Sequence, residues 1–152
     1  MAESKFNFGA VKANVDRVTR ELPLILANDA KNEFLKNFAD QGFDGKSWEE
    51  VQRRIPGTGP YKYPLTKDLG RHTRNILQGP GSGRLRVAVA NMVDTGHPID
   101  RGYLLIVKNE YAIYHNEGAE HLPQRRFVGD TPALKALLKD KIAKVINGVW
   151  KR

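Results

Sequence analysis

The sequence predicts an α+β fold in which a long N-terminal helix and a C-terminal helix pack on a small antiparallel sheet. Apolar residues recur every three or four positions near both ends of the chain, as they do on one face of a helix. In the middle, apolar and polar residues alternate, which is typical of a half-buried strand. The length of 152 residues suits one domain, which we expect to span 1–152 with its core at about 10–149.

The N-terminal helix is expected over residues 11–39. Its first apolar stripe consists of Val11, Val15, Val18 and Leu22, and its second of Leu26, Ala30, Phe34, Leu35 and Phe38. Pro23 lies between the two stripes. Because proline has no backbone N–H and its ring clashes with the preceding turn, we expect the helix to bend near Pro23. Gly42 follows as a typical residue just beyond a helix end.

A long loop is expected over residues 41–65, because glycine and proline recur there too often for a long regular element. The residues expected to attach this loop to the core are Trp48, Tyr61 and Tyr63. Residues 66–77 are then expected to form a short helix, with Thr66 as its N-cap. Its inward-facing residues are expected to be Leu69, Thr73, Ile76 and Leu77.

The hydrophobic period then changes from that of a helix to that of a strand. Over residues 84–93, Leu85, Val87 and Val89 alternate with Arg84, Arg86 and Ala88. A turn at 95–98 leads to a second, more apolar strand at 103–108. Strands joined by a short connection usually pair antiparallel, so these two define the predicted sheet. A third short strand is expected at 126–129.

The C-terminal helix has the clearest pattern in the chain. Its apolar stripe consists of Leu134, Leu137, Leu138, Ile142, Val145, Ile146 and Val149. Asp130 or Thr131 is expected to cap it, with Pro132 in the first turn. The opposite face, with Lys135, Lys139 and Lys144, is expected to be solvated.

Composition limits the classes of function. The chain has no cysteine, which excludes a disulfide framework and a thiol nucleophile. Its apolar runs are far shorter than the roughly 20 residues of a membrane-spanning helix, and no signal sequence precedes them, so we expect no membrane contact and synthesis in the cytosol. The net charge of +8, with 25 Lys and Arg against 17 Asp and Glu, permits a polyanionic neighbour.

No combination of residues indicates an enzyme, and we expect no catalytic residue, metal or cofactor. His115, Glu117, Glu120 and His121 lie close in sequence and could ligate a metal ion, although the spacing of the zinc helix motifs is absent. Arg125, Arg126 and Phe127 combine guanidinium groups with an aromatic ring. They could stack on a base or a partner, or form an edge strand with a core phenylalanine and solvated arginines.

Several short motifs occur in an order that resembles a known family. Phe34–Trp48 resembles an opening of the form F…QGFDG..W, and Ile76-Leu77 with Gly83 and Leu85 resembles an "IL…G.L" motif. Tyr111, Ala112, His115 and Gly118 are similar to a "YA..H..G" motif. Pro123, Arg125, Phe127 and Gly129 are similar to a "P.R.F.G" motif before the last helix, and Arg126 stands where the family often has proline. The family is the virion morphogenesis, or tail-completion, group of tailed bacteriophages and prophages.

The resemblance implies a structural protein of the phage head–tail junction that assembles into a homo-oligomeric ring. Its partners would be neighbouring connector or tail proteins, with packaged DNA as a further contact, and its location would be the virion after assembly in the host cytoplasm. Tyr111 and His115 would anchor the loop before Gly118, and Arg125 and Arg126 would be interface residues. Two alternatives stay open: a basic nucleic-acid-binding module using Arg84, Arg86, Arg125 and Arg126, and a metal-dependent hydrolase using the His115 cluster.

Overall fold

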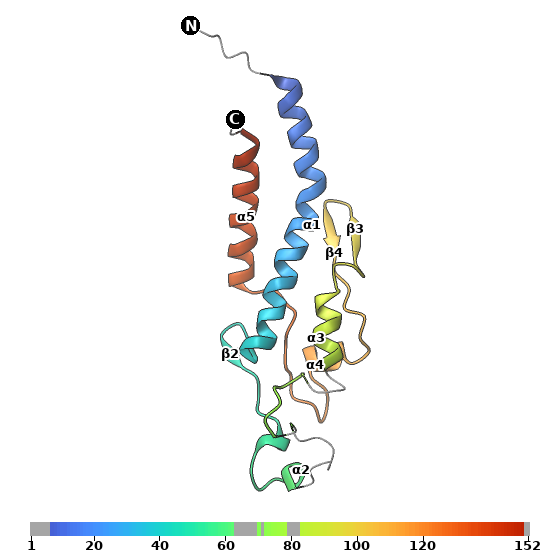
Figure 1. The fold of residues 1–152 in the computed structure, drawn as a ribbon, viewed down its shortest axis with the longest axis vertical. Coiled ribbons are helices and arrows are strands. Elements are labelled where there is room, and N and C mark those ends of the chain that lie inside the picture. The colour runs from blue at the N-terminus through green and yellow to red at the C-terminus, as the bar shows by residue number, and fades with distance from the viewer. Residues whose placement is uncertain (1–6, 63–69, 71, 79–82, 151–152) are drawn as a thin grey trace.

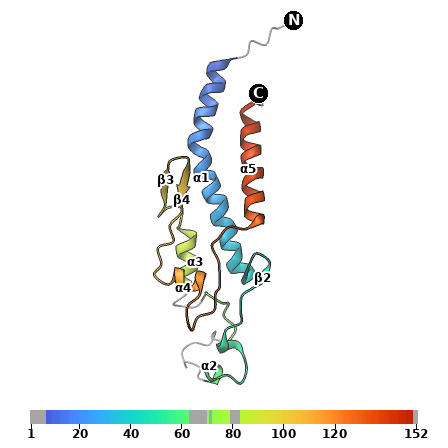
Figure 2. The same cartoon turned by 180° about the vertical axis from the view of Figure 1, so that it is seen from behind.

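Two long helices, α1 (Phe8–Asp40) and α5 (Pro132–Trp150), lie side by side in the computed structural model (Figures 1 and 2). The structure describes residues 7–62, 70, 72–78 and 83–150. Smaller elements lie against the rest of α1 and extend beyond its C-terminal end, so the molecule is elongated (Figure 1). Helices and small antiparallel sheets together confirm the predicted α+β class.

Helix α1 confirms the prediction for residues 11–39. Asn7 caps its N-terminus, because the side-chain oxygen of Asn7 accepts a hydrogen bond from the Ala10 N–H at 3.0 Å. The helix continues through Pro23 and changes direction partway along in both ribbon views, as the predicted bend requires. It ends at Gln41, whose φ of 53° places it in the left-handed region.

The core is built around the second half of α1. The buried residues of this helix are Ala27, Ala30, Phe34 and Phe38. The ring of Phe38 meets Trp48 edge to face, with centroids 5.7 Å apart, and Phe127 at 5.3 Å. Such aromatic pairs stabilise a core beyond the area that they bury. Trp48 therefore attaches the long loop to the core, as predicted.

Residues 84–93 do not form a strand, and this prediction is wrong. Residues Gly83–Ala90 form helix α3, which packs on α1. Leu85 is 1% exposed and Val89 is fully buried, whereas Val87 is 56% exposed. The buried positions Leu85, Val89, Met92 and Val93 are spaced by four, three and one residues, as on one face of a helix. The alternation of valines masked this second pattern.

The sheet is also placed differently from the prediction. Strand β3 (His97–Ile99) pairs antiparallel with β4 (Gly102–Leu104), with Pro98 opposite Tyr103. The expected turn at 95–98 thus supplies most of one strand, and the predicted strand at 103–108 ends at Leu104. A second two-stranded sheet joins β1 (Gly42–Phe43) to β2 (Lys46–Ser47).

The long loop after β2 contains two short helical turns, η1 (Gln52–Arg54) and α2 (Gly59–Lys62). The ring of Tyr61 in α2 stacks on the ring of His72, which lies further along the chain. Tyr63, Thr66 and Leu69 lie outside the described residues. Residues 72–78 form turns and not the predicted helix, and Leu77 has a φ of 58° that no α-helix allows. Of the residues expected to face inward, Ile76 and Leu77 are buried, whereas Thr73 is exposed and its prediction is wrong.

Helix α5 lies where the C-terminal helix was predicted, but of its apolar stripe only Leu134 is buried, and Ile146 is 45% exposed. Thr131 is the cap, since its Oγ1 accepts a hydrogen bond from the Leu134 N–H at 3.0 Å, and Pro132 is the first helical residue. Leu134 is buried, and Lys135, Lys139 and Lys144 are exposed. None of the described helices combines the length and apolar character needed to cross a bilayer.

Candidate protein–protein interaction site

The motif segments of the sequence meet at one place, which we call the hub: Asn37, Phe38, Trp48, Asn116 and residues 125–128. Residues 126–129 were predicted as a strand, but they pair with no strand among the described residues. Side chains take the place of a neighbouring strand. The Trp48 Nε1 donates to the Arg126 carbonyl at 2.7 Å, and the Asn37 Nδ2 donates to the Phe127 carbonyl at 2.8 Å.

Asn116 completes this arrangement from α4 (Ala112–Glu117). Its Oδ1 accepts hydrogen bonds from the N–H groups of Phe127 at 3.1 Å and Val128 at 3.0 Å. The Arg125 N–H donates to the His115 carbonyl at 2.8 Å. Because buried backbone groups need partners, these bonds explain how an extended segment without a sheet can be buried. Sequence reasoning did not single out Asn37 and Asn116, although both lie inside or beside the quoted motifs.

Arg125 belongs to the interior, which corrects its expected role as an interface residue. It is 5% exposed, and its Nε and Nη2 both donate to the Glu49 carbonyl at 3.2 Å. Burial lowers the pKa of the Arg125 guanidinium, and the carboxylates of Glu49 and Glu50 partly oppose this shift. Arg126 is exposed, with its guanidinium 5.7 Å from the centre of the Phe43 ring.

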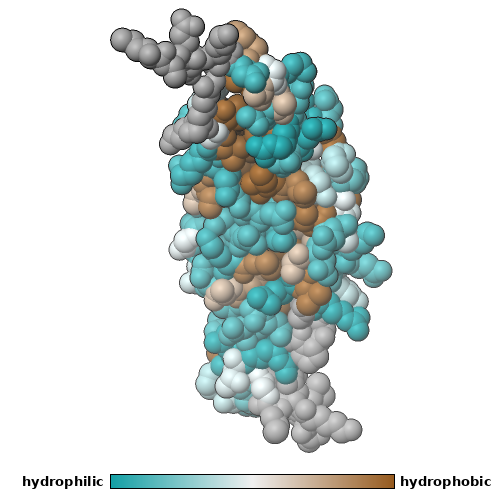
Figure 3. Space-filling view, turned by 45° about the horizontal axis from the view of Figure 1, so that its top comes forward, coloured by the Kyte–Doolittle hydropathy of each residue, from teal (hydrophilic) through white to brown (hydrophobic). Residues whose placement is uncertain are grey.

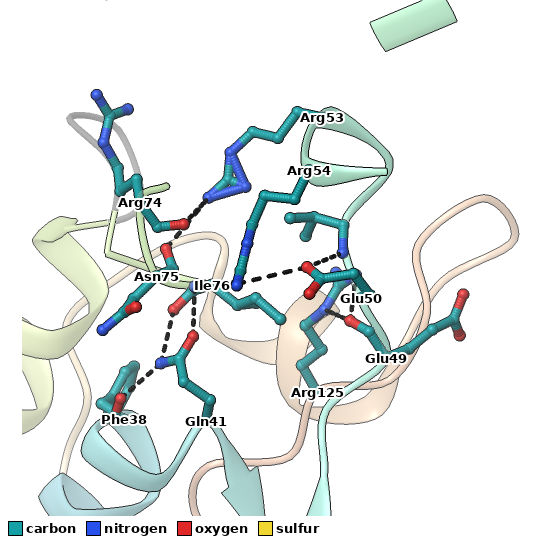
Figure 4. A network of polar contacts seen from close by, with 11 residues as sticks. Phe38, Gln41, Glu49, Glu50, Arg53, Arg54, Arg74, Asn75, Ile76 and Arg125 are labelled. Carbon is teal, nitrogen blue, oxygen red and sulfur yellow. Dashed lines mark hydrogen bonds and ion pairs between the residues drawn. The ribbon is translucent and has the colours of Figure 1, made fainter. Parts of the chain in front are cut away.

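A polar network joins Arg125 to the long loop (Figure 4). Glu50 forms an ion pair with Arg54 at 3.4 Å. Arg53 donates to the Arg74 carbonyl at 2.8 Å. Gln41 donates to the carbonyls of Phe38 and Ile76 and accepts from the Ile76 N–H, so it connects the end of α1 to the turn at 72–78.

His115 lies half-buried beside Arg125. Its Nδ1 is buried and has no hydrogen-bond partner among the described residues. Burial lowers the pKa of His115, and the positive charge of Arg125 lowers it further. Tyr111 does not anchor the loop through its side chain, which corrects the expectation, because that side chain is exposed. The backbone of Tyr111 makes the local contacts instead. Its N–H donates a hydrogen bond to the Asn109 side-chain oxygen, and its carbonyl accepts one from the His115 N–H.

Gly118 fits its place in the motif for a physical reason. Its φ of 83° is unfavourable for other residues, and a Cβ would lie 3.2 Å from the Gln124 nitrogen. The turn that follows is closed by paired backbone bonds between Ala119 and Leu122. Pro123 after it is half-buried, Leu85 is in the core, and Gly83 begins α3.

The other candidate residues form no chemical site in the described part of the chain. No group of three or more histidine or acidic residues lies close enough there to hold a metal ion. His121 and Glu120 are exposed while His115 is half-buried. Arg84 and Arg86 are both exposed on α3.

A concave surface of about 740 Å³ lies between the two long helices, and we call it the α1/α5 groove. Its lining includes Val18, Leu22, Leu26, Leu138, Ile142 and Ile146. Tyr103 of β4 also lines it. In Figure 3, hydrophobic surface lies between hydrophilic areas in the upper part of the molecule, where the two helices run side by side. Apolar surface of this kind is typical of sites that bind another protein.

A second apolar surface, which we call the α4 patch, consists of Tyr111, Ile113 and Tyr114. Their exposed fractions are 65%, 63% and 55%. Tyrosine is enriched at protein interfaces, because it has a large apolar ring and a polar end. The motif analysis had noted Tyr111, but the sequence carried no sign that these three side chains are exposed together.

No protein-family model, no curated protein and no solved structure matches the chain. Function is therefore inferred from the residues and from the geometry of the chain itself.

Proposed function

We propose that this chain is a structural protein of the phage head–tail junction, acting in neck assembly or tail completion. It works through contacts with copies of itself and with neighbouring connector or tail proteins, in the virion. The ordered motifs that resemble the tail-completion family support the location. The observation that carries the mode of action is the α1/α5 groove, which is apolar and open along the helices.

The hub supports the same proposal from another direction. The motif residues Trp48, Gly118 and Phe127 serve the fold, since they are buried or occupy a backbone conformation that favours glycine. These residues therefore maintain the shape of the molecule, and the function is argued from the surface that this shape presents.

Deletion of the gene from its phage or prophage tests the proposal. Filled heads and finished tails should accumulate without joining, as seen by electron microscopy, while DNA replication stays normal. Expression of the intact gene from a plasmid should restore infectious particles. Infectious particles in the deletion strain would contradict the proposal.

A gel-shift series across salt concentrations separates this function from nucleic-acid binding through the exposed arginines Arg84 and Arg86. Binding through phosphate contacts would fall steeply with salt, because counterions are released. Tight, salt-dependent binding by a monomer would favour the nucleic-acid module. Weak binding by a self-associating protein would favour the junction protein.

A further inference from the structure

We propose that the α1/α5 groove of one copy binds the α4 patch of a second copy, so that the chains associate head to tail. This inference rests on the proposed function, because it names the two surfaces of the self-association expected there.

The groove is a surface that the chain does not cover with its own described residues. Val15, Ile146 and Trp150 line it and are all exposed. The first half of α1 is poorly packed, since burial among the described residues of this helix begins at Ala27. Helices draw most of their stability from packing of an apolar face. The ion pairs Lys12–Asp16 and Arg17–Glu21 give this half only local support.

The α4 patch has the complementary character. Tyr111, just before α4, and Ile113 and Tyr114 within it are exposed. Aromatic side chains such as these tyrosines are the anchors that dominate binding energy at interfaces. An anchor needs a pocket on the partner, and the α1/α5 groove, of about 740 Å³, is lined mostly by apolar side chains.

Charge also favours this pairing. Helix α5 carries four lysines and one aspartate, and residues 8–26 of α1 carry three cations and two anions. Residues 108–121, around the patch, carry three glutamates and one lysine, all exposed. The groove itself is lined mostly by apolar residues, with Arg101 among its lining, but the helices that flank it carry a net positive charge and the segment around the patch a net negative charge. These opposite net charges favour contact between a groove and a patch, whereas the flanks of two grooves would repel.

Pro23 gives the groove a polar feature that suits tyrosine. Because proline has no N–H, the Thr19 carbonyl lacks the donor that normally bonds it four residues later. Thr19 and Pro23 both line the groove. A tyrosine hydroxyl needs a hydrogen-bond partner when it is buried, and this carbonyl can accept its proton.

The two surfaces lie in different parts of the molecule. Helix α4 lies beside α3, away from the free ends of α1 and α5 in both ribbon views. The contact joins two different surfaces, so it can repeat from copy to copy in one direction. Such head-to-tail contacts build rings when the rotation closes and filaments when it does not.

Two variants and a matched control test the pairing by sedimentation equilibrium. Ile146→Glu alters the groove, Tyr114→Glu alters the patch, and Leu24→Glu is the control. Leu24 is 44% exposed and Ile146 45%, but Leu24 does not line the groove. The first two changes should each weaken self-association by about tenfold or more, and the control by less than about twofold. Unchanged melting temperatures would show that the variants are folded, and Trp150→Glu replaces Ile146→Glu if that variant unfolds.

Mixing the two defective variants is the decisive measurement. Each retains the surface that the other lacks, so the mixture should form a dimer and grow no further. Mixed single-cysteine variants Ile146→Cys and Tyr114→Cys should likewise form a disulfide under mild oxidation, because the natural chain has no cysteine to compete. Leu24→Cys mixed with Tyr114→Cys should form none.

Three outcomes would overturn the inference: a mixture that stays monomeric, an Ile146–Ile146 crosslink in the Ile146→Cys variant alone, or a natural chain that is monomeric up to about 1 mM. These results leave the proposed function standing if the gene deletion still blocks joining. A mixture that dimerises, together with a deletion strain that makes infectious particles, would instead contradict the proposed function.

Discussion

At the scale of single residues, the hub shows how side chains can replace a strand. Residues 125–128 belong to no strand, Arg125 and Phe127 among them are buried, and backbone groups of residues 126–128 bond to Asn37, Trp48 and Asn116. An amide side chain offers both a donor and an acceptor, and an indole offers one donor. Local pattern predicted a strand here because an extended, buried segment has the same sequence character whether its partner is a strand or a set of side chains.

The neighbouring arginines of the hub should respond differently to charge reversal. Arg125→Glu would place a carboxylate against the Glu49 carbonyl in the interior, so we expect a loss of at least about 2 kcal/mol in the free energy of unfolding. Arg126→Glu changes an exposed side chain and should stay within about 1 kcal/mol. Urea unfolding of both variants measures this. Equal stability of the two would show that Arg125 is not buried in solution.

His115 should make stability depend on pH. Burial and the charge of Arg125 lower the pKa of His115 in the folded protein, whereas the unfolded chain titrates near its ordinary value of 6.5. The unfolded state therefore takes up the proton first as pH falls. The stabilising contribution is complete above about pH 6.5 and is lost progressively below it.

The measurement compares melting temperatures at about pH 7.5 and 5.5. The His115→Gln variant should lose less stability between these values than the natural protein does, because the linked proton is gone. The exposed His121 provides the control, and His121→Gln should retain the natural dependence. The same pH dependence in both variants would mean that His115 titrates equally in the folded and unfolded chains.

At the scale of elements, α3 gives the sharpest contrast between a helix and a strand. In a strand, Leu85 and Val87 would point to the same face, whereas in the helix only Leu85 is buried. Leu85→Ala should cost about 2–5 kcal/mol, and Val87→Ala should stay within about 0.5 kcal/mol. Thermal unfolding of the two variants decides between them. Comparable losses would restore the strand prediction.

The elements that sequence analysis predicted well are those whose pattern extends over many turns. The long helices α1 and α5 repeat their apolar spacing often enough to exclude other periods, and Thr131 with Pro132 marks the start of α5. The segment 84–90 is short, and its three alternating apolar residues are compatible with both a strand and a helix. The choice depends on which face meets α1, and this is a tertiary property that a local pattern does not contain.

The candidate site was predictable to a similar degree. The sequence predicted that Trp48 attaches the long loop to the core and offered Phe127 as a core residue, but it did not indicate that both pack on Phe38. The burial of Arg125 was not predictable, since its acceptor is a backbone carbonyl 76 residues away in sequence. The α1/α5 groove also depends on how two distant helices diverge, and neither helix alone carries that information.

At the scale of the whole molecule, the two ends differ in how they are stabilised. One end holds the aromatic cluster of Phe38, Trp48 and Phe127 together with its polar network. The other end consists of α1 and α5, with the groove between them and few buried side chains (Figure 1). The first end fixes the shape of the molecule, and the second presents apolar surface to a partner.

Because of this difference, the rate of amide hydrogen exchange should vary along helix α1. Amide hydrogens open to solvent with a free energy set by local burial, so the protection of α1 should be graded along its length. In the dilute protein, we expect the amides of residues 12–22 to exchange at least about tenfold faster than those of residues 30–38, measured by hydrogen–deuterium exchange with mass spectrometry. Uniform exchange along α1 would contradict this. At concentrations where the protein self-associates, the faster half should slow to match the other. The first half of α1 would then report occupancy of the groove, because its backbone becomes protected only when a partner covers it.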